Sequence, residues 1–421
     1  MVSSEQKTDY PETPRQFYAA RIDEHQSYLE TLQRQSTWMS RLRGLTFLPA
    51  AAMAVYGAVS AANPWPWYTL AAILFAAFIA ICTIHEVILR RASEVRHRRS
   101  MNRIQLARLD RRWRDIPVPE VAAPERHQPV SRDLDLFGNS SVFQLVSLAH
   151  TPWGQETLRD WLLEPAAADQ IEERQQAVSI LAADLGFRED LDLRGRQLVA
   201  SETGPEAFVR WAESPPWLAR RPWLIWLTRG LATAALATAI VAFSGWVETV
   251  TGWTMFLGVV LVNLAVNFLF VGKVYEIFGN VSSRSHDIQH YRPLLEEIAE
   301  LPKGCTFFDR LKSKMGRTSH EPIQLLGSLT RIIRFANLRR DGLIGIPYVF
   351  SQLIFLTDFH VLCVLERWQQ RHGHVVRDWL QSVAQLEAIS SLATLAHDHP
   401  DWTMPVVSDA AETTIKSKSL N

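Results

Sequence analysis

The sequence predicts a mainly α-helical protein in which two transmembrane helical hairpins accompany a helical domain on the cytoplasmic side. Three observations predict this fold class. Four long, almost uncharged stretches occur in two close pairs, and the remaining segments place apolar residues at helical spacing. In addition, no run of alternating β-branched residues indicates an extended sheet. The overall composition, with 47% apolar and 21% charged residues, looks ordinary because it averages these unlike segments.

The four apolar stretches are long enough to cross a membrane. They cover residues 44–62, 67–84, 224–246 and 252–272, and Arg229 is their one charged side chain. A helix that rises 1.5 Å per residue needs about 20 residues to cross about 30 Å of hydrocarbon. Short links join the stretches in pairs, which predicts hairpins at residues 44–90 and 222–272. The alternative, buried helices of a large soluble protein, is disfavoured because four such runs in two close pairs are hard to bury otherwise.

The basic residues beside these stretches predict their orientation. They are Arg34, Arg41 and Arg43 before the first stretch, ten arginines between residues 90 and 114, Arg220 and Arg221 before the third stretch, and Lys273 after the fourth. The two links inside the hairpins carry a single charge, that of Glu248. Because positive residues remain on the cytoplasmic side, we expect the N-terminus, the middle and the C-terminal third in the cytoplasm.

The arginine-rich stretch that follows the second apolar run is compatible with a helix until Pro117. Its candidate contact residues are Arg96, Arg98, Arg99, Arg103, Arg108, Arg111 and Arg112. One interpretation is a basic helix that binds nucleic acid. The other is a juxtamembrane segment that contacts anionic lipid headgroups, which its position directly after a membrane span favours. A proline-rich linker at residues 116–129 separates this stretch from the next helical segments.

The sequence offers little for catalysis or metal binding. The three cysteines, Cys82, Cys305 and Cys363, lie far apart, which argues against a disulfide framework and against a zinc site. A cluster near a helix end comprises His397, Asp398, His399 and Asp401. Adjacent spacing does not place metal ligands on one helix face, so solvated helix ends are the favoured interpretation. The formal net charge of zero provides no global attraction for a polyanion.

The segment "TPWGQETLRDWLLEP" has the pattern of a short amphipathic helix. Its apolar stripe comprises Leu158, Trp161 and Leu162. Thr151 is placed to cap the N-terminus with its hydroxyl, and Pro165 is placed to end the helix. We expect Arg174, in the following helix, to pair with Glu164 or with another carboxylate of the core.

A longer apolar stripe lies near the C-terminus. It comprises Trp379, Val383, Leu386, Ile389, Leu392 and Leu395, and Pro400 and Pro405 follow it. This spacing predicts an amphipathic helix that ends before the first proline.

Several of these residues also form an ordered motif. Leu134 to Leu136 precede a Thr-x-x-Gly turn, a Leu-x-x-Trp-Leu helix, a proline and an Ile-x-x-Arg-x-x-Ala-Val helix. The residues that carry it are Thr151, Gly154, Leu158, Trp161, Leu162, Pro165, Ile171, Arg174, Ala177 and Val178. This pattern resembles the start of the helical core domain of MutS-family mismatch-repair proteins. The segment "QLEAISSLATLAHDHPDWTMPVV" resembles the closing helix of the same domain.

The resemblance covers about residues 133–200 and 381–407. The apolar hairpin between them is similar to that of a membrane-anchored MutS-related branch found among bacteria. In the family the core domain is a scaffold that connects the DNA-contacting parts to an ATPase and holds no catalytic residues. The resemblance therefore implies structural roles for the matching residues, and a multi-pass protein of the bacterial inner membrane with both termini in the cytoplasm.

The family's ATPase needs a Gly-x-x-x-x-Gly-Lys-Ser/Thr loop, whose backbone amides hold the phosphates. The one Gly-Lys pair here, Gly272–Lys273, is followed by Val274 at the end of an apolar stretch. We therefore expect no enzymatic activity and no cofactor in this chain; the family's ATP and Mg²⁺ would bind in a domain past residue 407. The family's N-terminal mismatch-reading domain has no counterpart in the first 130 residues either.

The expected organisation follows from these observations. It comprises a cytoplasmic N-terminal helix (1–43), the first hairpin (44–90), the basic helix and linker (91–130), the first part of the MutS-like core (131–221), the second hairpin (222–272), the second part of the core (273–407) and a disordered tail (408–421).

Three functions are compatible with this organisation. The first is a membrane-anchored scaffold without its own motor, with membrane lipid, double-stranded DNA, a separate ATPase subunit or further copies of itself as partners. The second is a fragment of a membrane MutS-like protein, which binds ATP and DNA and whose ATPase lies downstream. The third is a small four-span transporter. This last function is disfavoured because Asn263 and Asn267 are the polar residues of the fourth stretch and no acid accompanies them.

Overall fold

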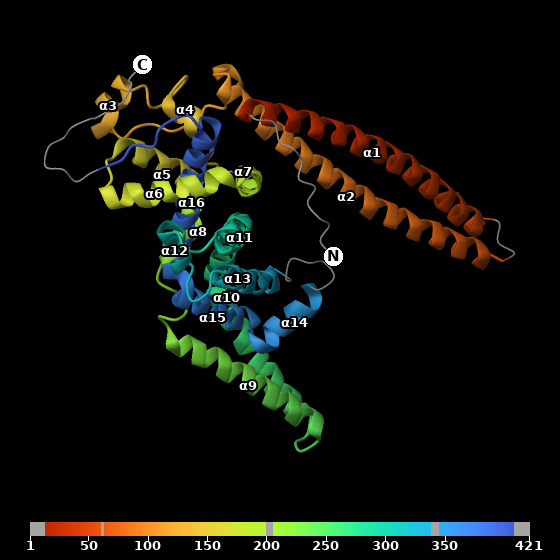
Figure 1. The fold of residues 1–421 in the computed structure, drawn as a ribbon. Helices are drawn as coiled ribbons and strands as arrows, with labels where there is room; N and C mark the ends of the chain where they lie inside the picture. The colour runs from red at the N-terminus through yellow and green to blue at the C-terminus, as the bar shows by residue number, and fades with distance from the viewer. Residues whose placement is uncertain (1–12, 60–62, 199–204, 338–344, 408–421) are drawn as a thin grey trace. The chain divides into compact units, whose positions relative to one another are not determined.

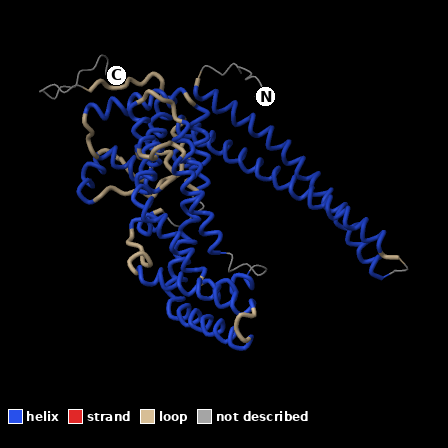
Figure 2. The backbone as a smooth tube through the Cα atoms, turned by 90° about the horizontal axis from the view of Figure 1, so that it is seen from below, coloured by secondary structure: helices blue, strands red, loops and turns tan. Residues whose placement is uncertain are grey.

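A computed structural model describes residues 13–59, 63–198, 205–337 and 345–407. These residues form helices joined by loops and contain no strand, which confirms the mainly α-helical prediction (Figure 2). The chain divides into two compact units. The first comprises Met1–Ser147, Ala183–Leu193 and Thr394–Trp402, and the second comprises Leu148–Ala182, Arg194–Ala393 and Thr403–Asn421.

The first unit is dominated by two long antiparallel helices, α1 (Pro14–Val59) and α2 (Trp65–Leu109) (Figure 1). At 1.5 Å per residue, each is roughly 70 Å long. Away from the membrane-compatible ends, Leu29 and Leu32 of α1 pack against Ala92 and Val95 of α2. At those ends, large apolar side chains such as Leu48 and Val59 are exposed, as expected of helices that could cross a membrane.

The predicted boundaries at residues 43/44 and 90/91 fall inside these continuous helices. The N-terminal helix and the first apolar stretch form one helix, and the second apolar stretch continues into the basic stretch as far as Leu109. The physical reason is that neither junction contains a helix-breaking residue beyond Gly44, whose cost of about 1 kcal/mol is easily offset by tertiary packing.

Short elements complete the first unit. They are η1 (Trp113–Asp115), η2 (Glu125–His127), α3 (Gln128–Asp133), α4 (Val142–Val146), most of α7 (Leu185–Leu198) and the end of α16 (Val376–Asp398). Hydrogen bonds from Gln144 connect α4 to the segment after α2: its Nε2 donates to the carbonyl oxygens of Trp113 and Ile116 at 3.2 and 2.8 Å.

The second unit is built around α16, the dark blue helix in the upper left part of Figure 1. Its other helices are α5 (Pro152–Leu163), α6 (Ala168–Ala183), α8 (Glu206–Glu213), α11 (Arg292–Glu300), α12 (Thr306–Ser313), α13 (Glu321–Asn337), α15 (Thr357–His372) and the one-turn η4 (Gly373–Val375). The stripe predicted for α16 is too narrow. Its polar residues Ser382, Glu387 and Ser391 are as buried as Trp379 and Val383, so this helix is a central one and not an amphipathic surface helix.

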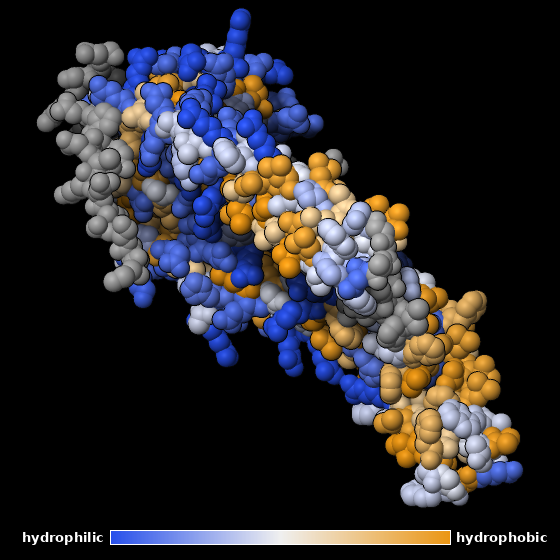
Figure 3. Space-filling model, turned by 90° about the vertical axis from the view of Figure 1, so that its right-hand side faces the viewer, coloured by the Kyte–Doolittle hydropathy of each residue, from blue (hydrophilic) through white to orange (hydrophobic). Residues whose placement is uncertain are grey.

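The second hairpin belongs to the same unit and consists of α9 (Pro222–Ser244) and α10 (Thr249–Gln289). Helices α1, α2, α9 and α10 are each long and apolar enough to cross a membrane, as the sequence predicted. Trp226, Phe243 and Phe268 of this hairpin are more than two-thirds exposed. Hydrophobic residues (orange) cover its end at the bottom of Figure 3.

A further apolar helix, α14 (Gly345–Phe355), packs against the second hairpin and was not predicted. The chain turns by 84° between Tyr348–Phe355 and Thr357–Asp398, and Leu356 at the turn adopts the left-handed conformation with φ of 51°. Asn263 of α10 satisfies the carbonyl groups freed by this turn. Its Nδ2 donates to the carbonyl oxygens of Leu353 and Ile354, both at 2.9 Å.

Candidate functional site

The turn before α5 is held by a carboxylate from α16. The Oε1 of Glu387 accepts hydrogen bonds from the backbone N–H groups of His150 and Thr151, at 3.0 and 3.2 Å. The Thr151 hydroxyl donates to Oε2 of Glu387, and its oxygen accepts from the Gly154 N–H at 2.9 Å. Thr151 therefore caps α5 as predicted, and Glu387 completes the cap.

Gly154 is required by the same contact. A Cβ atom at residue 154 would lie 2.1 Å from Oε2 of Glu387 and 2.9 Å from Oγ1 of Thr151. Glu387 is fully enclosed, and this burial raises the pKa of its carboxyl group, against the lowering effect of the hydrogen bonds from Thr151 and His150. The Thr-x-x-Gly pattern is thus explained by close approach to a buried carboxylate.

Ser391, one turn further along α16, binds the same segment. Its Oγ accepts from the Leu148 N–H at 2.9 Å and donates to the Glu387 carbonyl oxygen at 2.9 Å. Sequence reasoning missed Glu387 and Ser391 as functional positions. The available signal was that both polar residues lie within a helix of otherwise apolar character, where a buried polar group needs a partner.

The other motif residues serve packing. Leu158, Ala177 and Val178 are buried in the core. Trp161 is half-buried beside Phe307, with ring centroids 6.3 Å apart, and the guanidinium of Arg174 stacks over its indole at 3.9 Å. The contact of Arg174 with an aromatic ring was not predicted, since we expected it to pair with Glu164 or with another carboxylate of the core. Leu162 is half-buried, and Pro165 is exposed just after α5 ends.

The predicted contact arginines have different surroundings. Arg96, Arg103 and Arg111 are exposed. Arg98 forms ion pairs with Glu189, at 3.5 Å, and with Asp190. The remaining exposed arginine, Arg112, pairs with Asp115 at 2.9 Å, and Arg99 is half-buried.

Arg108 does not fit the prediction of a lipid or nucleic-acid contact. It is buried, and its guanidinium donates to the carbonyl oxygens of Val146 and Ser147 after α4. It lies on the face of α2 that packs inside the first unit, where the buried residues Asn102 and Gln105 also lie. A polybasic pattern alone does not distinguish this inward face from the outward one.

The cluster at the end of α16 is also less solvated than we predicted. Asp398 is buried and accepts a hydrogen bond from the Tyr18 hydroxyl at 2.7 Å, while Arg188 donates to Thr394 at 2.8 Å. Burial raises the pKa of Asp398 to about 6. Within the described residues, no group of three His, Cys, Asp or Glu side chains is arranged to hold a metal ion.

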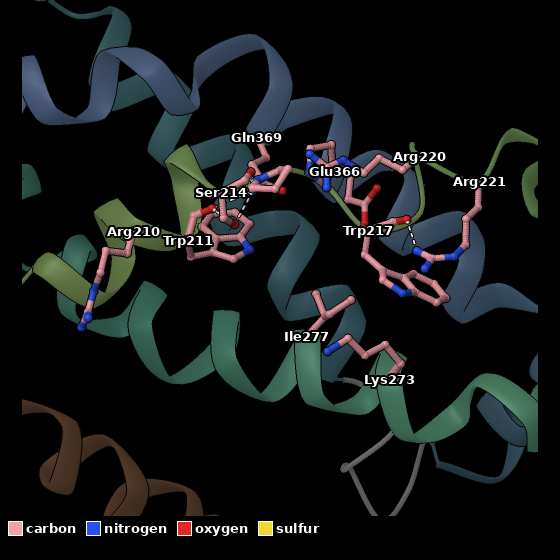
Figure 4. Close-up of a pocket in the computed structure, with 12 residues that line it drawn as sticks. Arg210, Trp211, Ser214, Trp217, Arg220, Arg221, Lys273, Ile277, Glu366 and Gln369 are labelled. Carbon is pink, nitrogen blue, oxygen red and sulfur yellow. Dashed lines mark hydrogen bonds between the residues drawn. The ribbon is translucent and has the colours of Figure 1, made fainter.

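A cavity of about 590 Å³ lies at the base of the second hairpin. The connection between α8 and α9 forms one wall with Trp217, Arg220 and Arg221, and α10 faces it with Lys273 and Ile277 (Figure 4). Helix α15 provides Glu366 and Gln369, and α8 provides Arg210 and Trp211. From the sequence we had used three residues of this cavity, Arg220, Arg221 and Lys273, but only to predict the orientation of the hairpin in a membrane.

The fold defines a class: a mainly helical protein with four helices that could cross a membrane. No family model matches the chain, and no curated protein or solved structure is significantly similar to it.

Proposed function

We propose that the protein is a membrane-anchored, non-catalytic helical scaffold built on a MutS-like core. In this proposal it is a multi-pass protein of the bacterial inner membrane with both termini in the cytoplasm, an orientation supported by the arginines that flank the apolar stretches. Its expected partner is a separate ATPase subunit, which would supply the site for ATP and Mg²⁺.

The observation that carries the proposal is the packing of Thr151 and Gly154 against Glu387. The first two residues belong to the stretch that resembles the start of the MutS core, and Glu387 belongs to the stretch that resembles its end. These stretches are more than 200 residues apart in sequence, and they share hydrogen bonds in one unit. A core interrupted by a membrane hairpin requires this juxtaposition, so the packing supports the resemblance.

The burial and hydrogen bonding of the residues around this contact support a structural role for it. Glu387, Ser391 and Thr151 are buried, and their polar atoms bind one another and nearby backbone groups. A buried network of this kind rigidifies a domain, and it presents no accessible nucleophile or base to a substrate. Any contact with double-stranded DNA would use the exposed residues Arg96, Arg103 and Arg111.

The transporter function has less support. Two polar side chains of α10 bind the last residues of α14, next to the turn into α15: Asn263 donates to two carbonyl groups there, and Asn267 accepts from Gln352 at 3.0 Å. These groups close a break in a helix, which is a structural use of polar residues in an apolar segment.

The proposal is tested with the full chain expressed in bacterial cells. We expect it to remain in the membrane fraction after a wash with high salt and after a wash at alkaline pH. The purified chain should hydrolyse ATP no faster than a buffer blank. Recovery of folded protein in the soluble fraction would overturn the membrane anchor, and ATP hydrolysis above the blank would overturn the non-catalytic role.

The choice of partner is tested in the same membranes. Chemical cross-linking followed by purification should recover a protein with a nucleotide-binding site, and gel shifts at physiological salt should report whether duplex DNA binds. If the full chain cross-links to no ATPase, the partner named here is wrong.

A further inference from the structure

The cavity at the base of the second hairpin has an unusual set of side chains. Of its twelve lining residues, four are basic: Arg210, Arg220, Arg221 and Lys273. Glu366 is the one acid among them, so the lining carries a net charge of +3. The volume of about 590 Å³ lies within the range of roughly 300–1,000 Å³ that is typical of small-molecule sites.

The acid in the lining is engaged by the wall of the cavity. The two carboxylate oxygens of Glu366 accept from the N–H groups of Leu218 and Ala219, both at 2.7 Å. These bonds fix the connection that carries Arg220 and Arg221. Burial raises the pKa of Glu366, while these backbone N–H groups and the charge of Arg221 oppose the rise, so the carboxylate is committed to the wall of the cavity.

Hydrogen bonds also hold other side chains of the lining in place. Gln369 Nε2 donates to the carbonyl oxygens of Trp211 and Ser214, at 2.6 and 2.7 Å. The guanidinium of Arg221 lies 4.7 Å from the centre of the Trp217 ring and donates to the Trp217 carbonyl oxygen at 2.9 Å. Preformed walls lower the entropy that a ligand loses on binding.

Three basic groups remain accessible. Arg210, Arg220 and Lys273 are exposed, and the contact of Lys273 with Glu276 is an exposed pair three residues apart on one helix. Such a pair contributes little to stability, so an anionic ligand can compete for the ammonium group.

The level of the cavity along the hairpin indicates the ligand. Helix α9 begins at Pro222, directly after Arg221, and the apolar stretch of α10 ends just before Lys273. The rings of Trp217 and Trp223 pack against Phe270, with centroids 6.0 and 6.4 Å apart. Tryptophan and basic residues at the end of an apolar helix are typical of the headgroup level of a bilayer.

We propose that this cavity binds the phosphate headgroup of one anionic glycerophospholipid from the surrounding membrane, with Arg220 and Lys273 as the phosphate ligands. The inference rests on the proposed membrane anchor, because only a hairpin within a bilayer brings the cavity to the headgroups. It assigns a specific lipid site to this cavity, separate from the non-specific attraction expected of the arginine-rich stretch on α2.

The experiment is native mass spectrometry of the full chain in detergent, with phosphatidylglycerol, phosphatidylcholine or inorganic phosphate added. The test variant is Arg220→Gln/Lys273→Gln. Both residues are exposed, so we expect the variant to keep the fold. The matched control is Arg331→Gln/Arg334→Gln, which removes the same charge from exposed positions on α13.

We expect the unmodified chain and the control to retain one phosphatidylglycerol molecule in preference to phosphatidylcholine. The test variant should bind it at least tenfold more weakly, since it lacks two of the three accessible basic groups of the cavity. Equal binding by the test and control variants would overturn the site. Inorganic phosphate that displaces the lipid at equal concentration would overturn the choice of a lipid.

Membrane retention of each variant after an alkaline wash separates the two proposals. A chain that stays in the membrane but shows no lipid preference contradicts this inference alone. A chain that leaves the membrane contradicts the proposed function, and the lipid site with it.

Discussion

Gly154 of α5 and Glu387 of α16 lie in direct contact, so close that the smallest side chain at residue 154 would overlap the carboxylate. A Cβ atom there would be 2.1 Å from Oε2 of Glu387. The contact is made with the helix-capping end of α5, where Thr151 shares the same carboxylate. The first prediction concerns this contact.

Gly154→Ala is expected to lower the free energy of unfolding of the second unit by about 2–3 kcal/mol, because a buried, hydrogen-bonded carboxylate must move to make room. Thermal unfolding in detergent measures the change. The matched control is Gly327→Ala in α13, where a Cβ atom would meet nothing within 4 Å. This control should stabilise the helix by about 0.5–1 kcal/mol. Equal melting temperatures for the two variants would show that the contact does not constrain the fold.

The second prediction concerns pH. Burial raises the pKa of Asp398 from 3.8 to about 6, and the hydrogen bond from Tyr18 and the charges of Arg188 and Arg108 oppose this rise. A group whose pKa is higher in the folded state stabilises that state fully below pH 3.8, and its contribution is lost as the pH rises through about 6. The first unit should therefore lose about 2 kcal/mol of stability from this group between pH 4 and pH 7.

Asp398→Asn removes the titrating group and should flatten the dependence of the melting temperature on pH across this interval. The control is Asp401→Asn, an exposed position beyond the end of α16. If Asp398→Asn and the unmodified chain show the same slope between pH 4 and pH 7, the buried carboxylate does not set it.

The third prediction concerns the turn after α14. Asn263→Leu leaves the carbonyl groups of Leu353 and Ile354 without the donor that α10 provides. We expect a loss of about 0.6–1.7 kcal/mol, as measured for hydrogen bonds between membrane helices. Unfolding in mixed detergent micelles measures this loss. Thr233→Val serves as the control, since the Thr233 hydroxyl is exposed and donates within its own helix. An unchanged stability for Asn263→Leu would mean that the turn holds without this donor.

The fourth prediction compares how much two arginines of α2, Arg108 and Arg103, contribute to stability. Arg108→Gln should destabilise the first unit by about 1–3 kcal/mol, because the buried carbonyl groups of Val146 and Ser147 lose a charged donor. Arg103→Gln, five residues earlier and exposed, should change stability by less than about 0.5 kcal/mol. Chemical unfolding of both variants provides the comparison, and the prediction is wrong if the two lose the same amount.

The local sequence pattern was sufficient to predict several features of the fold. The apolar stretches predicted four membrane-compatible helices, and Thr151 ahead of Pro152 predicted a capped helix that starts there. Both inferences depend on residues within one element. Charge and hydrophobicity change at residues 43/44 and 90/91, but helices α1 and α2 continue through both positions, so these boundaries do not coincide with ends of secondary structure.

Features that depend on distant residues could not be predicted in the same way. The residues that neighbour Glu387 in sequence do not indicate that it binds Thr151. Those that neighbour Arg108 do not indicate that its guanidinium donates to carbonyl groups at the end of α4. The bend at Leu356 was missed because α14, with 11 residues, is too short to stand out as an apolar span.

The order of the chain gives the Thr151–Glu387 contact a further meaning for biosynthesis. A ribosome completes residues 148–154 long before Glu387 leaves its exit tunnel, and both helices of the second hairpin are made in between. The amino-terminal end of α5 must therefore wait, without its carboxylate partner, while that hairpin is synthesised and, in the proposed membrane anchor, enters the bilayer. Closure of this contact is then a late event, which follows the synthesis of the whole hairpin.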